Sequence, residues 1–429
     1  MGGYNTLPSY SYMKINPLNK TKNIWKLLGP GLITGASDDD PSGIATYSQA
    51  GAAFGLTTLW TAIITFPLMA AIQAMCARIG IVTSAGLTTT LKKHYSKTLL
   101  YVFVLISFPA IILNIGADIA GMGAVVTMLC PSVNSIIFSS VFVIVLIVCL
   151  IYFPYKKIAS VLKWLCLTLL LYFIIPFMVK QDGWAILKAT FIPPLKWNKE
   201  YVAILVAILG TTISPYLFFW QTSMENEDRA SKNKTVIIDK ADITNMRLDV
   251  NVGMLFSNLV MYFIILATGS VLFRGGITTI NTVQDAAMAL KPLAGNSAYL
   301  LFAVGIIGTG LLAIPVLAGS VSYMIAETFG WKEGLNTKWH ESKGFYLILA
   351  VSIIIGFGIN LLGIDPIKAL IFTAIAYGVT APILIAIIMH ICNNKKIMGE
   401  FTNKPLSNIL GAITLVLMTV AAVALFLTM

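Results

Sequence analysis

Three consecutive carboxylates, Asp38, Asp39 and Asp40, interrupt the first long apolar segment of the chain, and Pro41 follows at once. A carboxylate in the middle of a bilayer costs about 3 kcal/mol or more, so three in a row must face water or a cation. Pro41 cannot donate a backbone hydrogen bond, and it pushes Asp40 out of helical geometry. Unwound, acidic backbone at membrane depth is typical of a cation site.

A second apolar segment is broken in a similar way, by small polar residues and a proline over Gly210–Pro215. Two interrupted segments at corresponding positions of two halves predict a transporter site between the halves. Taken alone, Pro215 is equally consistent with a simple kink, because proline is common in membrane helices. The acidic break five segments earlier favours the site.

The elements that must position these residues are membrane spans. Of the 429 residues, 57% are hydrophobic and 11% are charged, whereas soluble proteins carry roughly 25% charged residues. The composition predicts an all-α polytopic membrane protein in contact with the lipid bilayer. We expect a polar cytoplasmic segment over 1–26, without a signal peptide, and a transporter domain over 27–429.

Eleven spans are predicted, and they divide into two halves of five and a terminal helix. The first half covers about 27–179, the second about 201–393, and the eleventh span about 407–428. The spans themselves are 27–54, 57–77, 99–128, 135–154, 160–179, 201–222, 250–273, 298–326, 344–362, 367–393 and 407–428.

The formal charge of +11 reflects membrane topology and does not indicate nucleic acid binding. Of the 29 Lys and Arg residues, 22 fall on the side of the N-terminus and 7 on the other side. Basic residues gather on the cytoplasmic side of membrane proteins. We therefore expect a plasma-membrane protein with a cytoplasmic N-terminus and an extracytoplasmic C-terminus.

The sequence gives no sign of an enzyme or of a bound cofactor. The five cysteines form no CxxC pair, and the three histidines lie at or near segment ends. A nucleophile–base pair, a P-loop and a metal-hydrolase motif are all missing from the pattern. The carboxylates of the first break remain the strongest candidates for chemistry.

The first segment carries the motifs Gly29-Pro30-Gly31 and Asp40-Pro41-Ser42-Gly43. Further motifs are Ala77–Thr83, Gly183-Trp184, Phe191–Pro193, Ala318-Gly319 and Pro382. Together they resemble the Nramp family of divalent-metal transporters. The resemblance covers nearly the whole chain. It implies a LeuT-like fold, with two inverted five-helix repeats, an eleventh helix, and helices 1 and 6 broken.

The departures from the family pattern are as informative as the matches. Gly43 stands where the family has Asn, Ser214 where it has Met, and Tyr216 where it has His. Gly121 replaces the Glu that follows Asp118, and the tenth-helix Gln aligns loosely with Ala374. This pattern resembles the divergent magnesium-transporting branch of the family.

The replacements change the chemistry that the site offers to a cation. A Met thioether favours transition metals, whereas Ser214 offers a small, hard oxygen. The change to Gly43 removes a side-chain ligand and leaves space. Because Mg²⁺ keeps several of its waters and binds one or two carboxylates, these changes favour a partly hydrated Mg²⁺, with Mn²⁺ as the other possible cargo.

Asp40 is the leading candidate for contact with the ion, directly or through one water. It can also cap the helix that restarts after Pro41, and the two roles are compatible. The resemblance implies that the carbonyls of Ser37 and Thr211 are ligands too. Asp38 and Asp39 either attract cations and bind the hydration shell, or one of them is a solvated charge at the vestibule rim.

In the family that the chain resembles, the residue matching Asp118 belongs to the proton route. Here this route lacks the Glu and the His that complete it in the family. We therefore expect weak or no proton coupling; the alternative is a structural Asp118. Tyr216 can donate to a water near the site or simply pack, and its aromatic surroundings favour packing. Asn258 and Thr373 are interpreted as residues that hydrogen-bond between helices.

Three other functions compete with magnesium uptake. A proton-coupled Mn²⁺ or Fe²⁺ importer of the Nramp type is the closest. A LeuT-fold carrier of an organic solute would need to tolerate the acidic trio, which repels a carboxylate. A membrane sensor would lack a soluble signalling domain. The sequence leaves the oligomeric state and the exclusion of Ca²⁺ open.

Overall fold

The structure is a computed structural model that describes residues 29–153, 155, 157, 167–231 and 238–428. The predicted cytoplasmic segment 1–26 and the start of the predicted span 160–179 lie outside these residues. Helices and their connections make up everything that is described, without a single strand. The all-α class is therefore confirmed.

The helices of the first half begin at residues that suit a helix start. Pro30 and Pro41 occupy first helical positions, while Ser96 and Asn134 accept a backbone N–H from inside the helices that follow them. Such starts satisfy or avoid the unpaired N–H groups of a first turn. The helices are α2 (Pro30–Asp38), α3 (Pro41–Phe54), α4 (Trp60–Thr83), α5 (Leu87–His94), α6 (Lys97–Leu129) and α7 (Ser135–Tyr152).

The second half uses the same devices, with Asn198, Asp239 and Asp365 as side-chain caps. Its long helices are α11 (Lys199–Thr212), α12 (Pro215–Ser231), α13 (Lys240–Thr268), α16 (Ala298–Phe329), α17 (Lys343–Asn360), α18 (Pro366–Asn393) and α20 (Pro405–Thr428). Short elements connect them: η1 (Leu167–Phe173), α9 (Ile175–Met178), α10 (Gly183–Phe191), η2 (Gly269–Phe273), α14 (Val283–Ala287), η3 (Met288–Leu290), α15 (Lys291–Ala294), η4 (Gly295–Ser297), α19 (Lys395–Met398) and η5 (Gly399–Phe401).

Nine stretches of the described chain are long and apolar enough to cross a membrane. Two predicted spans are not among them, for different reasons. The first is divided between the short helices α2 and α3, and the fifth begins outside the described residues. The nine stretches and the divided helix account for ten of the eleven predicted spans.

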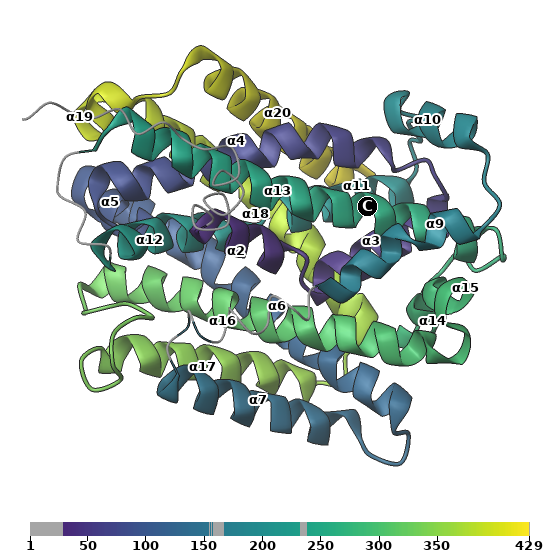
Figure 1. The fold of residues 1–429 in the computed structure, drawn as a ribbon. Helices are drawn as coiled ribbons and strands as arrows, with labels where there is room; N and C mark the ends of the chain where they lie inside the picture. The colour runs from purple at the N-terminus through teal and green to yellow at the C-terminus, as the bar shows by residue number, and fades with distance from the viewer. Residues whose placement is uncertain (1–28, 154, 156, 158–166, 232–237, 429) are drawn as a thin grey trace, which may run out of the picture.

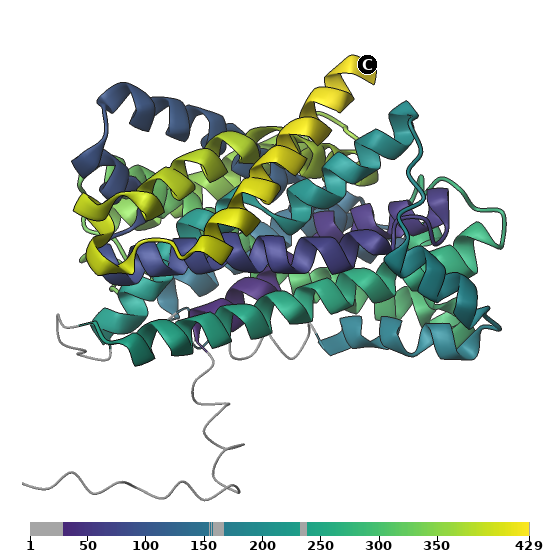
Figure 2. The same ribbon diagram turned by 90° about the horizontal axis from the view of Figure 1, so that it is seen from above.

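Burial separates an inner set of helices from an outer one. In the α11–α12 span, 89% of the apolar window is buried, whereas in α7 the share is 22% and in α20 it is 28%. Figure 1 shows α2 and α3 in the middle of the bundle, with α7 and α17 along one side and α20 along the other, and Figure 2 shows the same bundle from above. The broken helices are therefore positioned inside the protein.

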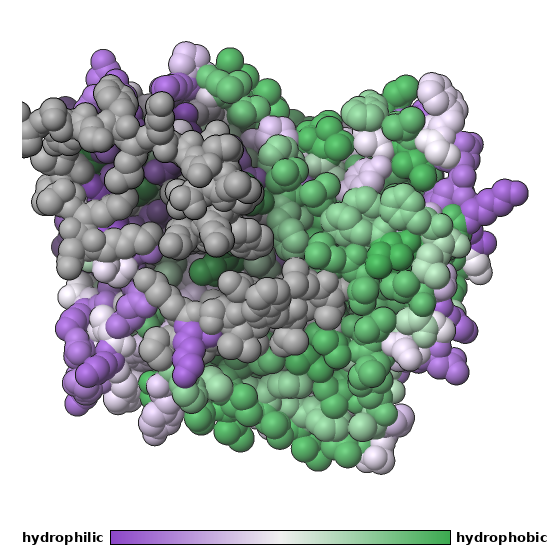
Figure 3. All heavy atoms as spheres, viewed as in Figure 1, coloured by the Kyte–Doolittle hydropathy of each residue, from purple (hydrophilic) through white to green (hydrophobic). Residues whose placement is uncertain are grey.

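The surface agrees with a membrane-spanning bundle. On the face in Figure 3, hydrophilic residues gather at the two ends of the helices, and the surface between them that is not covered in grey is hydrophobic. Exposed apolar residues such as Leu105, Ile144 and Val416 lie on α6, α7 and α20. In a lipid environment, such outward apolar faces are the expected state of a helix.

Candidate metal centre

The first helix break leaves a backbone carbonyl without its helical partner. The helix α2 ends at Asp38, Asp39 has φ −82° and ψ 55°, and Asp40 is extended with φ −70° and ψ 172°. Because Pro41 has no N–H, the carbonyl of Ser37, four residues earlier, cannot receive the hydrogen bond of a continuous helix. This carbonyl lies at the C-terminal, partially negative end of α2.

Asp40 contacts α3 and α6 through its two carboxylate oxygens and is linked to α18 through Asn114. Its Oδ1 accepts hydrogen bonds from the Gly43 N–H and the Ser42 hydroxyl, each at 2.7 Å, which is the capping role expected from the sequence. Its Oδ2 accepts from the Asn114 amide on α6 at 2.8 Å, and the Thr373 hydroxyl on α18 donates to the Asn114 oxygen at 2.9 Å. Thr373 therefore bonds between helices, as interpreted.

Asn114 is the site residue that the sequence analysis did not consider. It is fully buried in α6, one helical turn before Asp118. A polar residue four positions before an acid, on the same face of an apolar helix, is a signal that could have identified it.

The other two carboxylates of the trio turn toward α13. The Ser257 hydroxyl lies 2.7 Å from Asp38 Oδ2 and 3.3 Å from Asp39 Oδ1. Both aspartates are 0% exposed, so neither is a solvated charge at a rim, and that alternative was wrong. Within the described residues, no three Asp, Glu, His or Cys side chains converge as a metal-binding group. The trio is thus not a single set of ligands.

Asp118 is buried in α6. It is 0% exposed, and its carboxylate oxygens make no hydrogen bond of normal geometry within the described residues, although the backbone N–H of Ser42 on α3 is near enough to interact with them. An ionised carboxyl buried without a partner is costly, so Asp118 requires a proton or a cation nearby.

The second break repeats the first. The helix α11 ends at Thr212 and α12 begins at Pro215, so the Thr211 carbonyl also loses its helical N–H partner. Here the Ser214 hydroxyl donates to the Thr211 carbonyl at 2.6 Å. The Tyr216 hydroxyl donates to the carbonyl of Ser37 at 2.9 Å. Tyr216 therefore does more than pack, which corrects the preferred interpretation.

Gly43 shows how closely the two breaks approach each other. A Cβ added at Gly43 would lie 3.2 Å from the Thr211 hydroxyl and 3.4 Å from both the Asp38 carbonyl and the Tyr47 ring. The space expected from the missing Asn side chain is thus taken by α11 in this conformation. The glycine serves close packing here, and the prediction of a roomier pocket was wrong for this conformation.

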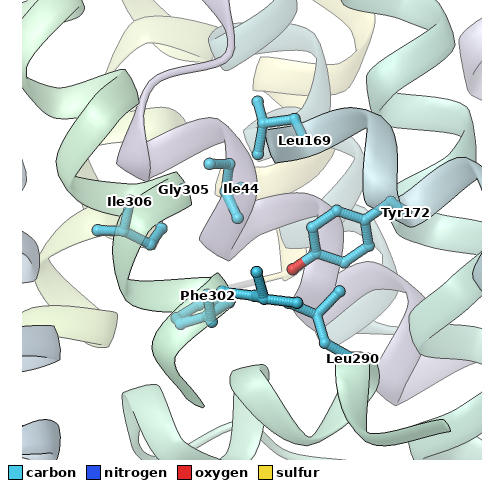
Figure 4. Close-up of a pocket in the computed structure, with 8 residues that line it drawn as sticks. Ile44, Leu169, Tyr172, Leu290, Phe302, Gly305 and Ile306 are labelled. Carbon is cyan, nitrogen blue, oxygen red and sulfur yellow. The ribbon is translucent and has the colours of Figure 1, made fainter. Parts of the chain in front are cut away.

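A small, partly open cavity lies apart from these breaks, between α3, η1, η3 and α16. Seven of its eight lining residues have no polar side-chain group, and the eighth is Tyr172. Figure 4 shows the Tyr172 hydroxyl directed into the cavity, and this hydroxyl has no partner among the described residues. One hydroxyl without a carboxylate does not make a cation site.

Comparison with known proteins covers almost the whole chain. The family model of natural resistance-associated macrophage protein-like proteins (Nramp) matches residues 31–428. The divalent metal cation transporter MntH of Caldanaerobacter subterraneus is 25% identical over 91% of this chain and 90% of its own length. MntH of Staphylococcus saprophyticus is 26% identical over 95% of this chain and 93% of its own length.

Solved structures share the fold. The manganese transporter of Eremococcus coleocola has a TM-score of 0.72 at 17% identity, over 94% of this chain and 86% of that chain. MhsT in complex with L-phenylalanine has a TM-score of 0.58 at 11% identity, over 93% of this chain and 98% of that one. The predicted LeuT-like fold, with helices 1 and 6 broken, is confirmed. Because the family model spans 31–428, the protein belongs to the Nramp family.

Proposed function

We propose that this protein imports divalent cations across the plasma membrane, and that the ion binds between the two helix breaks. The ligands in this proposal are Asp40, the carbonyls of Ser37 and Thr211, and the hydroxyl of Ser214. The support is that two prolines leave two carbonyls without helical partners beside one buried carboxylate. The names of the relatives, which are divalent metal or manganese transporters, agree with this class of cargo.

The remaining predicted residues have indirect roles in this proposal. Gly43 keeps the first break against Thr211 and donates its N–H to Asp40. Asp38 and Asp39, held toward Ser257, add negative charge beside the ion and attract it from water.

The donor set favours Mg²⁺ as the cargo. Ser214 is the observation that carries this choice, because it places a hard oxygen where the family has a soft thioether. The side-chain hydrogen bonds of Asp38, Asp39 and Asp40 likewise involve only oxygen and nitrogen partners. Mg²⁺ prefers oxygen ligands and few carboxylates.

Proton-coupled import of Mn²⁺ or Fe²⁺ is the second candidate. The names of the relatives favour it over magnesium, since the solved structure with the highest similarity reported above is a manganese transporter. Mn²⁺ shares the oxygen chemistry of Mg²⁺, so competition between the two ions is expected in both cases. Transport of Mg²⁺ itself is the measurement that separates the candidates.

The test is uptake into proteoliposomes under a K⁺-diffusion potential, negative inside, for the wild type and Asp40→Ala. We expect Mg²⁺ entry in the wild type and a loss of at least about tenfold in the variant, because a buried charged ligand contributes several kcal/mol. Asp365→Ala is the matched control. Asp365 also precedes a proline and caps a helix, α18, through the Lys368 N–H at 3.0 Å.

The outcomes separate the candidates. Entry of Mn²⁺ without Mg²⁺ would return the protein to the transition-metal group and refute the argument from Ser214. Equal losses in Asp40→Ala and Asp365→Ala would mean that Asp40 acts only as a helix cap. Failure to transport either ion, with transport of an amino acid, would favour the organic-solute carrier.

A further inference from the structure

The two helix breaks share a detail that bears on how tightly a cation is held. Each proline removes the N–H that would bond the carbonyl four residues earlier, at Ser37 and at Thr211. In the structure, each of these carbonyls accepts a hydrogen bond from a side-chain hydroxyl instead. The Tyr216 hydroxyl donates to the Ser37 carbonyl at 2.9 Å, and the Ser214 hydroxyl donates to the Thr211 carbonyl at 2.6 Å. Both hydroxyls belong to the second break and to the start of α12.

The bond from Tyr216 differs from that of Ser214 because it crosses between the repeats. Ser214 bonds a carbonyl three residues away in its own chain segment, whereas Tyr216 is 179 residues from Ser37. The side chain of Tyr216 is 0% exposed. Its own carbonyl accepts the Ser320 hydroxyl of α16 at 2.9 Å. The donor is therefore fixed in place from a third helix.

We propose that Tyr216 is a positioning residue that competes with the cation for the Ser37 carbonyl and thereby weakens ion binding. This inference rests on the proposed function, in which the Ser37 carbonyl is a ligand. The hydroxyl proton and a cation both approach the partially negative end of α2. The hydroxyl proton and the cation repel each other because both carry positive charge. The cation therefore either displaces the hydroxyl from the Ser37 carbonyl or binds this carbonyl while it still accepts the hydrogen bond from Tyr216.

This competition favours release of the ion. It also links ion binding to the contact between the end of α2 and the start of α12. While Tyr216 holds Ser37, the end of α2 is tied to the start of α12. Binding of the cation exchanges this bond for ligand bonds to the same elements. A neutral hydrogen bond is worth a factor of about two to ten in an equilibrium constant. Removal of the hydroxyl should therefore tighten binding by about two- to tenfold.

The experiment is Tyr216→Phe in the full-length purified protein, with binding and thermal stability measured against both MgCl₂ and MnCl₂. Without metal, the variant leaves the Ser37 carbonyl without a partner, so its Tm should lie below that of the wild type. With saturating metal the Tm difference should shrink or vanish, because the ion supplies the missing partner. The apparent Kd should fall by the factor given above.

The matched control is Tyr172→Phe, which removes a buried hydroxyl that lies outside the site and has no hydrogen-bond partner among the residues that the structure describes. Its metal affinity and its metal-dependent Tm shift should equal those of the wild type. If Tyr216→Phe lowers the Tm equally with and without metal, or if its Kd is unchanged or higher, Tyr216 is only structural and the inference is wrong.

A second measurement uses a fluorinated tyrosine that keeps the hydroxyl at position 216. It therefore does not depend on whether the Tyr216→Phe variant folds. With 3-fluorotyrosine incorporated at position 216, metal addition should shift the fluorine resonance, and at position 172 it should not. No shift at 216 despite metal binding by the wild type would overturn the inference alone. No stabilisation of the wild type by Mg²⁺ or Mn²⁺, together with the same result for Asp40→Ala, would overturn the proposed site as well.

Discussion

Asp40 has enough acceptor capacity to cap a helix and bind an ion at the same time. A carboxylate offers about four lone-pair directions. Three are used by Ser42, Gly43 and Asn114 in the structure. One direction therefore remains for a cation, and the three hydrogen bonds fix the orientation in which it is presented. Such support by neighbouring groups is a general feature of metal sites.

The support from Asn114 leads to a prediction at this scale. In Asn114→Ala, Asp40 loses a hydrogen bond to a charged group, which contributes about 1.5–3 kcal/mol. We expect Mg²⁺ binding to weaken by about tenfold, because Asp40 can then rotate away from the ion. Thr373→Val should weaken binding less, since Thr373 contacts Asp40 only through Asn114. Titration calorimetry on purified variants with unchanged Tm would measure both effects.

The opposite order, with Thr373→Val the more damaging, would contradict this chain of support. Unchanged binding in Asn114→Ala would show that the other two hydrogen bonds hold Asp40 by themselves.

The candidate site was predictable from the sequence only in part. Asp40 and the two prolines could be recognised because their cost in a membrane is local and independent of the rest of the fold. The role of Gly43 could not, because it depends on Thr211 of the other repeat occupying the space. The partner of Tyr216 is likewise 179 residues away. The identity of such neighbours is a property of the packed structure.

At the scale of elements, α2 depends on α13. A helix of nine residues is too short to be stable alone. Asp249 of α13 accepts the N–H groups of Gly29, Gly31 and Leu32 at 2.8, 2.7 and 3.2 Å, and so caps α2 from another helix. Gly31 lies so close to the α13 backbone that a Cβ would meet the Val250 nitrogen at 2.6 Å. These contacts hold α2 in place.

Asp249→Asn should loosen α2 while leaving the rest of the bundle intact. The variant loses the charge at a helix N-terminus and part of the hydrogen bonding, at a cost of about 1–2 kcal/mol. Hydrogen exchange of residues 30–38 should then become about 5- to 30-fold faster, with α3 unchanged.

The control is Asp239→Asn, which removes a carboxylate that caps α13 itself, through the Asp242 N–H at 2.7 Å. Equal exchange of 30–38 in Asp249→Asn and the wild type would mean that the glycine contacts alone retain α2.

Most elements were predictable from apolar length, because a membrane requires about 20 apolar residues per helix. The short helices at the surface were less predictable from apolar length. The α10 helix (Gly183–Phe191) is too short to span, and its exposed residues Trp184 and Phe191 would have been assigned to a loop by length alone. Its boundaries follow instead from the Asp182 cap.

At the scale of the whole molecule, the charge distribution supports the proposed direction of transport. The excess of Lys and Arg on one side predicts that this side is cytoplasmic. A membrane potential that is negative inside then drives a divalent cation inward with about 4.6 kcal/mol per 100 mV, twice the value for a single charge. In the proposed function, this potential supplies the driving force for import without a proton.

The geometry around Asp118 leads to the last prediction, which concerns this driving force. The side chain of Asp118 makes no hydrogen bond of normal geometry within the described residues. The resemblance to the family further implies that Gly121 and Tyr216 replace a Glu and a His of its proton route. We expect Mg²⁺ uptake into proteoliposomes to leave the internal pH unchanged, as reported by an enclosed pH dye, in both the wild type and Asp118→Asn. The rate should instead follow the imposed K⁺-diffusion potential. Acidification that accompanies uptake in the wild type and disappears in Asp118→Asn would establish proton coupling through Asp118. That result would favour the manganese-type mechanism, because the potential alone would then not account for import.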